Sequence, residues 1–306
     1  MRQSVRAIRA VEMELADPVR AAAFFTGVWN LSEVARDDGA IYLRSSCAFH
    51  HVLAIHPSRG PARVRRVVFE ADGRALVDAL HAKIAAMVDQ AEAPHPLQRA
   101  GGGYGFGFAD ARGRSFAVIC DGEDHADDGR AADRPYKIAH VNLNDTEARG
   151  SADFFAEALG FRCVDHSGPQ FFLNGDSTDH SSVVVCQAEQ ATLNHIAFEM
   201  ADLDSVMRGA GRMRDHGYPI EWGVGRHGPG NNAFAYFAGP EEMPLEYTAD
   251  VLQIDDAYEF HGPDYWKWPP GRLDRWGVTA PHSQRWKRVQ TLFDFAPDAY
   301  RLARHD

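Results

Sequence analysis

Apolar runs with strand spacing alternate with helical segments along the chain. The first run covers 6–16, after which Asp17 offers a helix N-cap and Pro18 suits the first helical position. The segment VRAAAFFTGVW that follows has apolar residues at helical spacing, and short strands are expected within 32–57. The pattern therefore predicts a unit made of one strand, one helix and two or three further strands.

The same order of elements is expected three more times. The later units are predicted to begin with strands at 64–70, 137–143 and 193–199, followed by helices at 74–90, 146–159 and 202–215. Sequence echoes support the duplication, because Phe24-Phe25 matches Phe154-Phe155 and RVVFEADG matches HIAFEMAD. A repeat of about 55 residues is long for a solenoid. We therefore predict an α+β fold built from four βαβββ units.

Composition divides these units into two pairs. The segment DGEDHADDGRAADR at 121–134 is charged and poor in apolar residues, which favours a linker, although a long hairpin loop fits the same pattern. We expect an N-terminal pair in 1–124 and a C-terminal pair in 135–250. The remaining residues, 251–306, contain four tryptophans and several prolines, and we expect them to pack on the C-terminal pair.

Charge and composition narrow the possible partners. With 306 residues and 45% apolar content, the chain can bury a substantial core. A net charge of -11 argues against nucleic acid as a partner, because phosphate binding relies on Lys and Arg. We expect no membrane association, because no apolar stretch is long enough for a span. No secretory signal is evident, and four scattered cysteines fit a reduced, cytoplasmic setting.

Three residues of the C-terminal pair form a candidate metal site. His140, His195 and Glu246 lie in predicted first or last strands, 55 and 51 residues apart. Because side chains alternate along a strand, His140 shares a face with Asn142, and Glu246 shares a face with Thr248. Two imidazoles and one carboxylate are typical of non-haem Fe(II) oxygenases, and Mn(II) suits the same ligands. With 15 histidines in the chain, hydrogen-bonded structural histidines are the alternative.

The surrounding residues carry a family resemblance. The stretch GRHGPGNNAFAYFAGPEEMPLEYTAD at 225–250 resembles the C-terminal signature of type I extradiol dioxygenases in the vicinal oxygen chelate superfamily. His227, Tyr236 and Glu246 match it at spacings of nine and ten residues. AHVNLND at 139–145 and DHSSVVVCQ at 179–187 resemble the ligand and acid–base strands of the homoprotocatechuate 2,3-dioxygenase branch.

This resemblance implies a fold and a set of roles. It implies two domains with curved mixed sheets, and one metal in the C-terminal domain held by the three residues named above. His180 would act as acid–base residue. Its distance of 15 residues to His195 is one longer than in that branch, which makes Ser181 the alternative. His227 and Tyr236 would hydrogen-bond the substrate hydroxyls.

Four further positions are expected to contact substrate. Asn142 would hydrogen-bond substrate or oxygen, and Phe234 and Thr248 would also lie on the substrate side. Trp222 stands where the homoprotocatechuate enzymes have an arginine, which favours an apolar or aromatic ring substituent over a carboxylate.

The N-terminal pair is expected to lack the metal. Aligning the repeats places Glu12, Arg66 and Ala117 near the positions of the three ligands. An arginine and an alanine cannot form this site, so the N-terminal half is expected to be structural.

The resulting hypothesis is extradiol cleavage of a small aromatic diol by dioxygen. The substrate supplies the electrons, so no nicotinamide or flavin is needed. The resemblance also implies a homo-oligomer. Two alternatives stay open, namely a glyoxalase-like isomerase or lyase on the same scaffold, and a non-catalytic binding protein of the bleomycin-resistance type.

Overall fold

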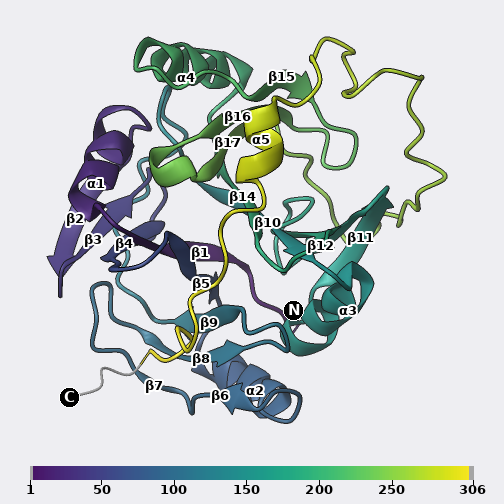
Figure 1. Ribbon diagram of the computed structural model, residues 1–306. Coiled ribbons are helices and arrows are strands. Elements are labelled where there is room, and N and C mark those ends of the chain that lie inside the picture. The colour runs from purple at the N-terminus through teal and green to yellow at the C-terminus, as the bar shows by residue number, and fades with distance from the viewer. Residues whose placement is uncertain (1–2, 303–306) are drawn as a thin grey trace.

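Each half of the chain forms one curved mixed sheet (Figure 1). The computed structural model describes residues 3–302. The N-terminal half contains β1 (Ala7–Leu15), α1 (Pro18–Gly27), β2 (Ser32–Asp37), β3 (Ala40–Arg44), β4 (Leu53–Pro57), β5 (Arg63–Glu70), α2 (Arg74–Ile84), β6 (Gln90–Ala91), β7 (His95–Pro96), β8 (Tyr104–Ala109) and β9 (Ser115–Cys120).

The C-terminal half repeats this order. It contains β10 (Lys137–Asp145), α3 (Ala148–Leu159), β11 (Arg162–Ser167), β12 (Gln170–Asn174), β13 (Val183–Gln187), β14 (Leu193–Glu199), α4 (Leu203–Asp215), β15 (Trp222–Arg226), β16 (Ala233–Ala238), a 3-10 turn η1 (Pro240–Glu242) and β17 (Pro244–Ala249), and the tail adds α5 (Gln284–Val289).

The strand orders confirm the α+β fold with four related units. They are β2-β3-β4-β1-β5-β9-β8-β6, with β7 beside β8, and β11-β12-β13-β10-β14-β17-β16-β15. In each sheet the first strand of one unit pairs with the first strand of the next, as β1 does with β5 and β10 with β14. Two four-stranded units thus join edge to edge into one curved sheet.

Local signals explain the helix ends, with one exception. Asp17 accepts a hydrogen bond from the Arg20 backbone N–H, so it caps α1 as expected. The helix predicted at 74–90 ends at Ile84, which makes that prediction six residues too long. The chain turns instead, and Gln90 joins β6 opposite Ala109. Sheet pairing here outweighs helical propensity.

The segment 121–134 connects the halves and lies against the N-terminal half. Asp124 forms a β-bridge with Phe49, and the His125 N–H donates to the Ala48 carbonyl. Its polar composition reflects a surface path, while these backbone bonds keep it ordered.

One apolar core joins the two halves. Trp29, directly after α1, is fully buried and stacks on Tyr247 of β17 with ring centroids 3.7 Å apart. Its ring also meets Phe198 and Phe237 edge-on. The first unit therefore completes the core beneath the fourth unit.

The tail follows a longer path than expected. It forms bridges from Asp165 to His261 and from Leu193 to Phe293 in the C-terminal half, and then from Val64 to Phe295 in the N-terminal half. The yellow trace in Figure 1 shows this descent from α5 toward β8. We expected the tail to pack on the C-terminal pair, and this holds for only part of its length. Its last described residues pack against the N-terminal sheet.

A close contact anchors that turn. A Cβ atom at Gly107 of β8 would lie 1.7 Å from the Tyr300 carbonyl oxygen, so only glycine allows the tail to lie there. Leu302 packs with Ala10 and Ala117 in a small apolar cluster. The tail thereby covers part of the first sheet.

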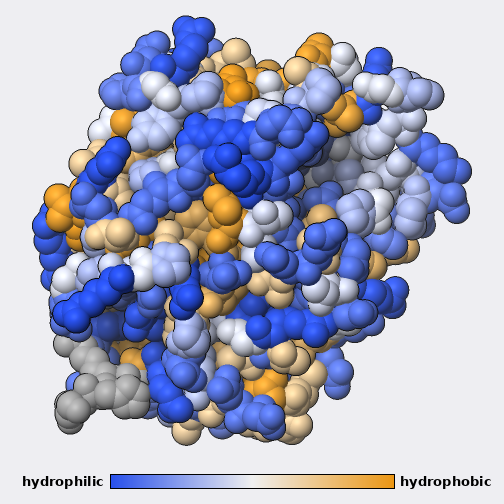
Figure 2. Space-filling view, in the orientation of Figure 1, coloured by the Kyte–Doolittle hydropathy of each residue, from blue (hydrophilic) through white to orange (hydrophobic). Residues whose placement is uncertain are grey.

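The surface fits the acidic, polar composition. Figure 2 shows mostly hydrophilic residues on this face, with apolar residues in scattered groups. Among the described residues, no helix is long and apolar enough to cross a membrane.

Candidate metal centre

Three donor atoms from three neighbouring strands converge in the C-terminal sheet. His140 Nε2 lies 3.2 Å from His195 Nε2 and 3.3 Å from Glu246 Oε2. His195 Nε2 lies 3.0 Å from the same carboxylate oxygen. Within the part of the chain that the structure describes, these residues form the one group of His, Cys, Asp and Glu side chains suited to hold a metal ion.

Strand register explains the convergence. His140 of β10 lies opposite Ala197 of β14, and Ala197 lies beside Glu246 of β17. His195 is two residues before Ala197 and so projects from the same face. The small alanine at the centre of this row leaves room for the three larger side chains to meet above it.

The spacing of the donors fits a divalent ion. Metal–ligand bonds of about 2.1 Å at right angles place neighbouring donors about 3.0 Å apart. Glu246 Oε2 is buried and has no hydrogen-bond partner, although both imidazoles face it. A buried carboxylate oxygen between two ring nitrogens is the arrangement expected of a facial site that leaves further coordination positions open.

A chain of amides orients one of the histidines. Asn194 Oδ1 accepts a hydrogen bond from His195 Nδ1 at 2.8 Å, and Asn194 Nδ2 donates to Asn144 Oδ1 at 2.9 Å. Asn144 in turn donates to Thr192 and to the Gln290 carbonyl. Because Nδ1 of His195 carries the proton in this network, its Nε2 lone pair is free for a metal.

Electrostatics keep the donors in their ligand forms. Burial alone would raise the pKa of Glu246, but the close imidazoles of His140 and His195 outweigh it and bring that pKa well below its usual range. Burial lowers the pKa of His195, although Glu246 opposes this shift. A metal therefore competes with few protons at neutral pH.

These shifts predict how metal loading depends on pH. A lowered histidine pKa keeps the imidazole neutral further into the acid range, so bound metal should be half released only below about pH 6.5, the ordinary histidine value. Metal content after dialysis at stepped pH measures the midpoint, and circular dichroism at each step controls for unfolding. Release centred above that pH in folded protein would contradict the expected shift.

His140 and His195 line the floor of a small cavity, and Glu246 is fully buried beside them. This cavity has a volume of about 70 Å³. Its remaining lining consists of Asn142, Gln170, Phe172, Ser181, Val184, His227, Pro229, Gly230, Asn232, Tyr236 and Val251. Asn142 is 1% exposed and its Oδ1 has no hydrogen-bond partner, so it offers a free acceptor at the cavity. Asn142 therefore lies where a contact with a ligand in the cavity would require it.

A larger outer cavity adjoins the inner one. It has a volume of about 420 Å³ and shares His195, His227 and Tyr236 with the inner cavity. The tail contributes Trp268, Leu273, His282, Trp286 and Gln290 to its walls. Trp286 is 2% exposed and its ring lies 4.8 Å from that of Tyr236. The tail thus helps to build the approach to the metal centre.

His227 and Tyr236 form a hydrogen-bonded pair beside the ligands. His227 Nε2 lies 2.8 Å from the Tyr236 hydroxyl and 3.9 Å from Glu246 Oε1. Burial lowers the pKa of His227 to about 4, so its ring is neutral at pH 7. Burial and then the charge of Glu246 raise the pKa of Tyr236 well above its usual value, so the phenol keeps its proton. The pair can therefore exchange a proton with a ligand in the cavity.

Three expected substrate contacts lie outside the inner cavity. Phe234 and Thr248 are fully buried and line neither cavity. Phe234 instead stacks on His227 at 4.0 Å, and Thr248 accepts a hydrogen bond from Asn232. Trp222 lines the outer cavity only, where it stacks on Tyr236. Phe234 and Thr248 therefore support residues at the cavity, which corrects their assignment as direct contacts.

The acid–base position also differs from the first expectation. His180 is fully buried and is not among the residues lining the inner cavity, whereas Ser181 is. His180 Nε2 is instead bonded to Asp165 Oδ2 at 2.7 Å. The structure thus favours the alternative register, in which the serine faces the ligand.

Some residues of the site carried no recognisable sequence signal. Asn232 approaches Glu246 Oε1 at 3.5 Å, and Asp165 is a fully buried carboxylate bonded to the tail. Trp286 comes from a tail whose path was not predicted. The adjacent Pro229-Gly230 turn was the one hint of a special loop near Asn232.

The N-terminal sheet lacks the donor set. Register places Ala10, Arg66 and Ala117 at the positions equivalent to His140, His195 and Glu246. The alignment of Glu12 with His140 was therefore wrong by two residues. Both β1 and β10 contain a register shift at matching positions, so the two strands stay in step, and pairing with β5 and β14 fixes the equivalence. The conclusion that this half cannot form the same metal site is unchanged.

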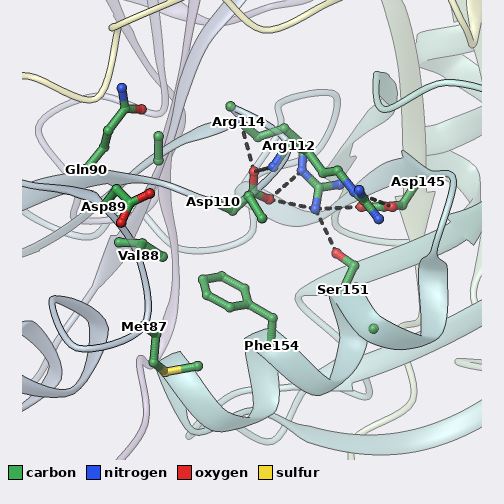
Figure 3. Close-up of a pocket in the computed structure, with 14 residues that line it drawn as sticks. Met87, Val88, Asp89, Gln90, Asp110, Arg112, Arg114, Asp145, Ser151 and Phe154 are labelled. Carbon is green, nitrogen blue, oxygen red and sulfur yellow. Dashed lines mark hydrogen bonds and ion pairs between the residues drawn. The ribbon is translucent and has the colours of Figure 1, made fainter.

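A different cavity, of about 570 Å³, lies between α3 and the segment 87–90 that follows α2 (Figure 3). Arg114 at its base is 1% exposed and is held by Asp110 at 2.7 Å, Asp145 at 2.8 Å and Ser151 at 2.7 Å. Arg112 also pairs with Asp145. These charges neutralise one another across the junction of the two halves, which is the pattern of a structural ion network.

Comparison with known proteins agrees with this fold. Residues 137–247 match the model of the Glyoxalase/Bleomycin resistance protein/Dioxygenase superfamily. A crystal structure of the Mn(II)-bound glyoxalase from Novosphingobium aromaticivorans is 32% identical, with a TM-score of 0.84 over 92% of this chain and 94% of that chain. The chain belongs to this superfamily. Within it, the resemblance to vicinal oxygen chelate enzymes is confirmed.

Two further proteins are similar to this chain. Metapyrocatechase 2 of Cupriavidus necator is 31% identical over 155 residues, which are 48% of this chain and 46% of that protein. The match thus spans less than half of that relative. A homoprotocatechuate 2,3-dioxygenase variant from Brevibacterium fuscum shares the fold, with 19% identity and a TM-score of 0.78 over 90% of this chain and 80% of that chain.

Proposed function

We propose that this superfamily member is a metal-dependent extradiol dioxygenase that cleaves a catechol-type ring beside its two hydroxyls. The observation that carries the proposal is the set of three donor atoms, 3.0–3.3 Å apart, beside a cavity that His140 and His195 line together with a histidine–tyrosine pair. His140, His195 and Glu246 would hold Fe(II) or Mn(II). When bound, the metal would supply positive charge and open positions that favour a deprotonated diol and dioxygen.

The side chains divide the remaining work. His227 Nε2 would take up a proton from the diol through the Tyr236 hydroxyl, which passes its own proton to His227 as it receives the proton of the ligand. Asn142 Oδ1 would accept a hydrogen bond from the ligand. The inner cavity is too small for a substituted ring, so a substituent would extend into the outer cavity.

The residues that line the outer cavity indicate which ring substituent it can hold. Trp222, Trp268 and Trp286 present aromatic surface there. No Lys or Arg lines this cavity among the described residues, so a carboxylate on the ring would lack a charged partner. We therefore propose a catechol with an apolar or aromatic substituent.

A panel of diols tests the function. We expect the chain, loaded anaerobically with Fe(II) or Mn(II), to consume oxygen and form a yellow ring-opened product with alkyl- or aryl-catechols, and to act more slowly on carboxylate-bearing catechols. A 1,3-diol of similar size is the control, because it cannot bind one metal through both oxygens. No oxygen uptake with any catechol would contradict the proposal.

A glyoxalase-like isomerase or lyase is the second candidate, favoured by the 32% identity to the Mn(II)-bound glyoxalase. Such a reaction consumes no dioxygen. Product formation that is unaffected by anaerobic conditions would therefore support it over ring cleavage.

A further inference from the structure

A buried hydrogen-bonded chain leads from the C-terminal tail to the cavity. Asp165 and His180 are fully buried, and Ser181 is 7% exposed and lines the inner cavity. Asp165 Oδ2 lies 2.7 Å from His180 Nε2, and His180 Nδ1 lies 3.3 Å from Ser181 Oγ. Both ring nitrogens of His180 thus have a partner. One is the carboxylate of Asp165, and the other is the hydroxyl of Ser181, which lines the cavity.

The partners of Asp165 define the direction of these bonds. Its carboxylate also accepts from the Tyr258 hydroxyl at 3.1 Å and from the His261 backbone N–H at 3.2 Å, and His261 Nδ1 lies 3.1 Å away. An ionised carboxylate only accepts hydrogen bonds, so Nε2 of His180 carries the ring proton. Its Nδ1 then offers a lone pair to the Ser181 hydroxyl, which donates to it. The lone pairs of Oγ remain available in the cavity.

The backbone around His180 leaves room for its imidazole ring behind Ser181. A Cβ atom at Gly230, which lines the same cavity, would lie 3.3 Å from His180 Nδ1. The His180 backbone N–H donates to the Leu252 carbonyl of the tail. Glycine on one side and the tail on the other therefore hold the imidazole directly behind Ser181.

We propose that Asp165, His180 and Ser181 form a proton relay that serves the metal-centre cavity. This inference rests on the proposed function. In the relay, a ligand O–H passes its proton to Ser181 Oγ while the Ser181 proton moves to His180 Nδ1. The imidazolium that forms is stabilised by Asp165, and the reverse transfer later returns the proton. Ser181 is the catalytic residue. His180 positions its hydroxyl and accepts its proton, and Asp165 positions the ring of His180.

Variants at the two central positions test the relay in the metal-loaded enzyme. Ser181→Ala is expected to lower kcat about 100-fold, the scale of general acid–base catalysis, with little change in KM. Ser181→Thr keeps the hydroxyl and should retain most of kcat. Ser182→Ala makes the same change at the next residue, which does not line the cavity, and should leave kcat unchanged.

Coupling separates a relay from a structural role. His180→Gln should lower kcat as Ser181→Ala does, and the double variant should be no slower than either single variant, because each breaks the same relay. Ser181→Ala, His180→Gln and the double variant should also lose the solvent deuterium isotope effect on kcat. Unchanged kcat in Ser181→Ala, or losses that multiply in the double variant, would overturn the proposal.

A spectroscopic measurement tests the relay even if the chain cleaves no catechol. In the zinc-loaded, diamagnetic chain, ¹⁵N-histidine NMR should show His180 with its proton on Nε2, assigned by the signal missing in His180→Gln. Asp165→Asn should shift this tautomer balance. A wild-type His180 with its proton on Nδ1 would rule out the relay, whereas absent ring cleavage with the expected tautomer would reject only the assigned reaction.

Discussion

Glu246→Ala is expected to lose the bound metal and with it all ring cleavage. The carboxylate is fully buried, and its Oε2 lies within 3.3 Å of both candidate imidazoles. Changes to residues that merely support a metal ligand cost about 10- to 100-fold in metal affinity, so loss of the anionic ligand itself should cost at least about 100-fold. Metal analysis after desalting, with oxygen uptake on the same samples, measures both effects.

Two controls make this result specific. Glu246→Gln keeps the size of the side chain but removes its charge, and should also lose tight metal binding. Glu189→Ala removes an exposed glutamate outside the site and should bind metal normally. Bound metal should raise the melting temperature of the wild type and of Glu189→Ala, but not of Glu246→Ala. Full metal content in folded Glu246→Ala would refute the assigned ligands.

Trp29→Ala is expected to cost about 3–5 kcal/mol in the free energy of unfolding, the range for a large buried aromatic side chain. The ring is fully buried, stacks on Tyr247 and meets Phe198 and Phe237 edge-on. Because Trp29 belongs to the first unit and these partners to the fourth, the loss should weaken the junction of the two halves. Urea unfolding followed by circular dichroism measures the change.

A second tryptophan provides the matched control for that prediction. Trp276 is 40% exposed and contacts Arg226 through its ring face, so Trp276→Ala should cost no more than about 1 kcal/mol. Trp29→Phe should recover part of the stability, because it restores an aromatic ring. Equal stability of Trp29→Ala and Trp276→Ala would show that the two halves do not depend on this contact.

The repeated units could be predicted from the sequence because they rest on local periodicity, and the candidate ligands stood out through the family resemblance of the strands that carry them. Alternation along a strand places His140 beside Asn142 on one face, and the same rule places His195 in line with Ala197. The capping residue Asp17 likewise acts within one turn of its helix. Such signals extend over a few residues and do not require knowledge of distant partners.

Tertiary structure decided the features that depend on strand pairing and long-range packing. Strand pairing in the first sheet places Ala10, and not Glu12, at the position equivalent to His140, and loop geometry before β13 turns Ser181 toward the cavity while His180 faces Asp165. The tail reaches the first sheet because Gly107 leaves space for it. The sequence by itself determined which side chains share a strand face, since that follows from local backbone geometry. Which faces meet depends on the packing of segments far apart in the chain, and only the folded structure shows it.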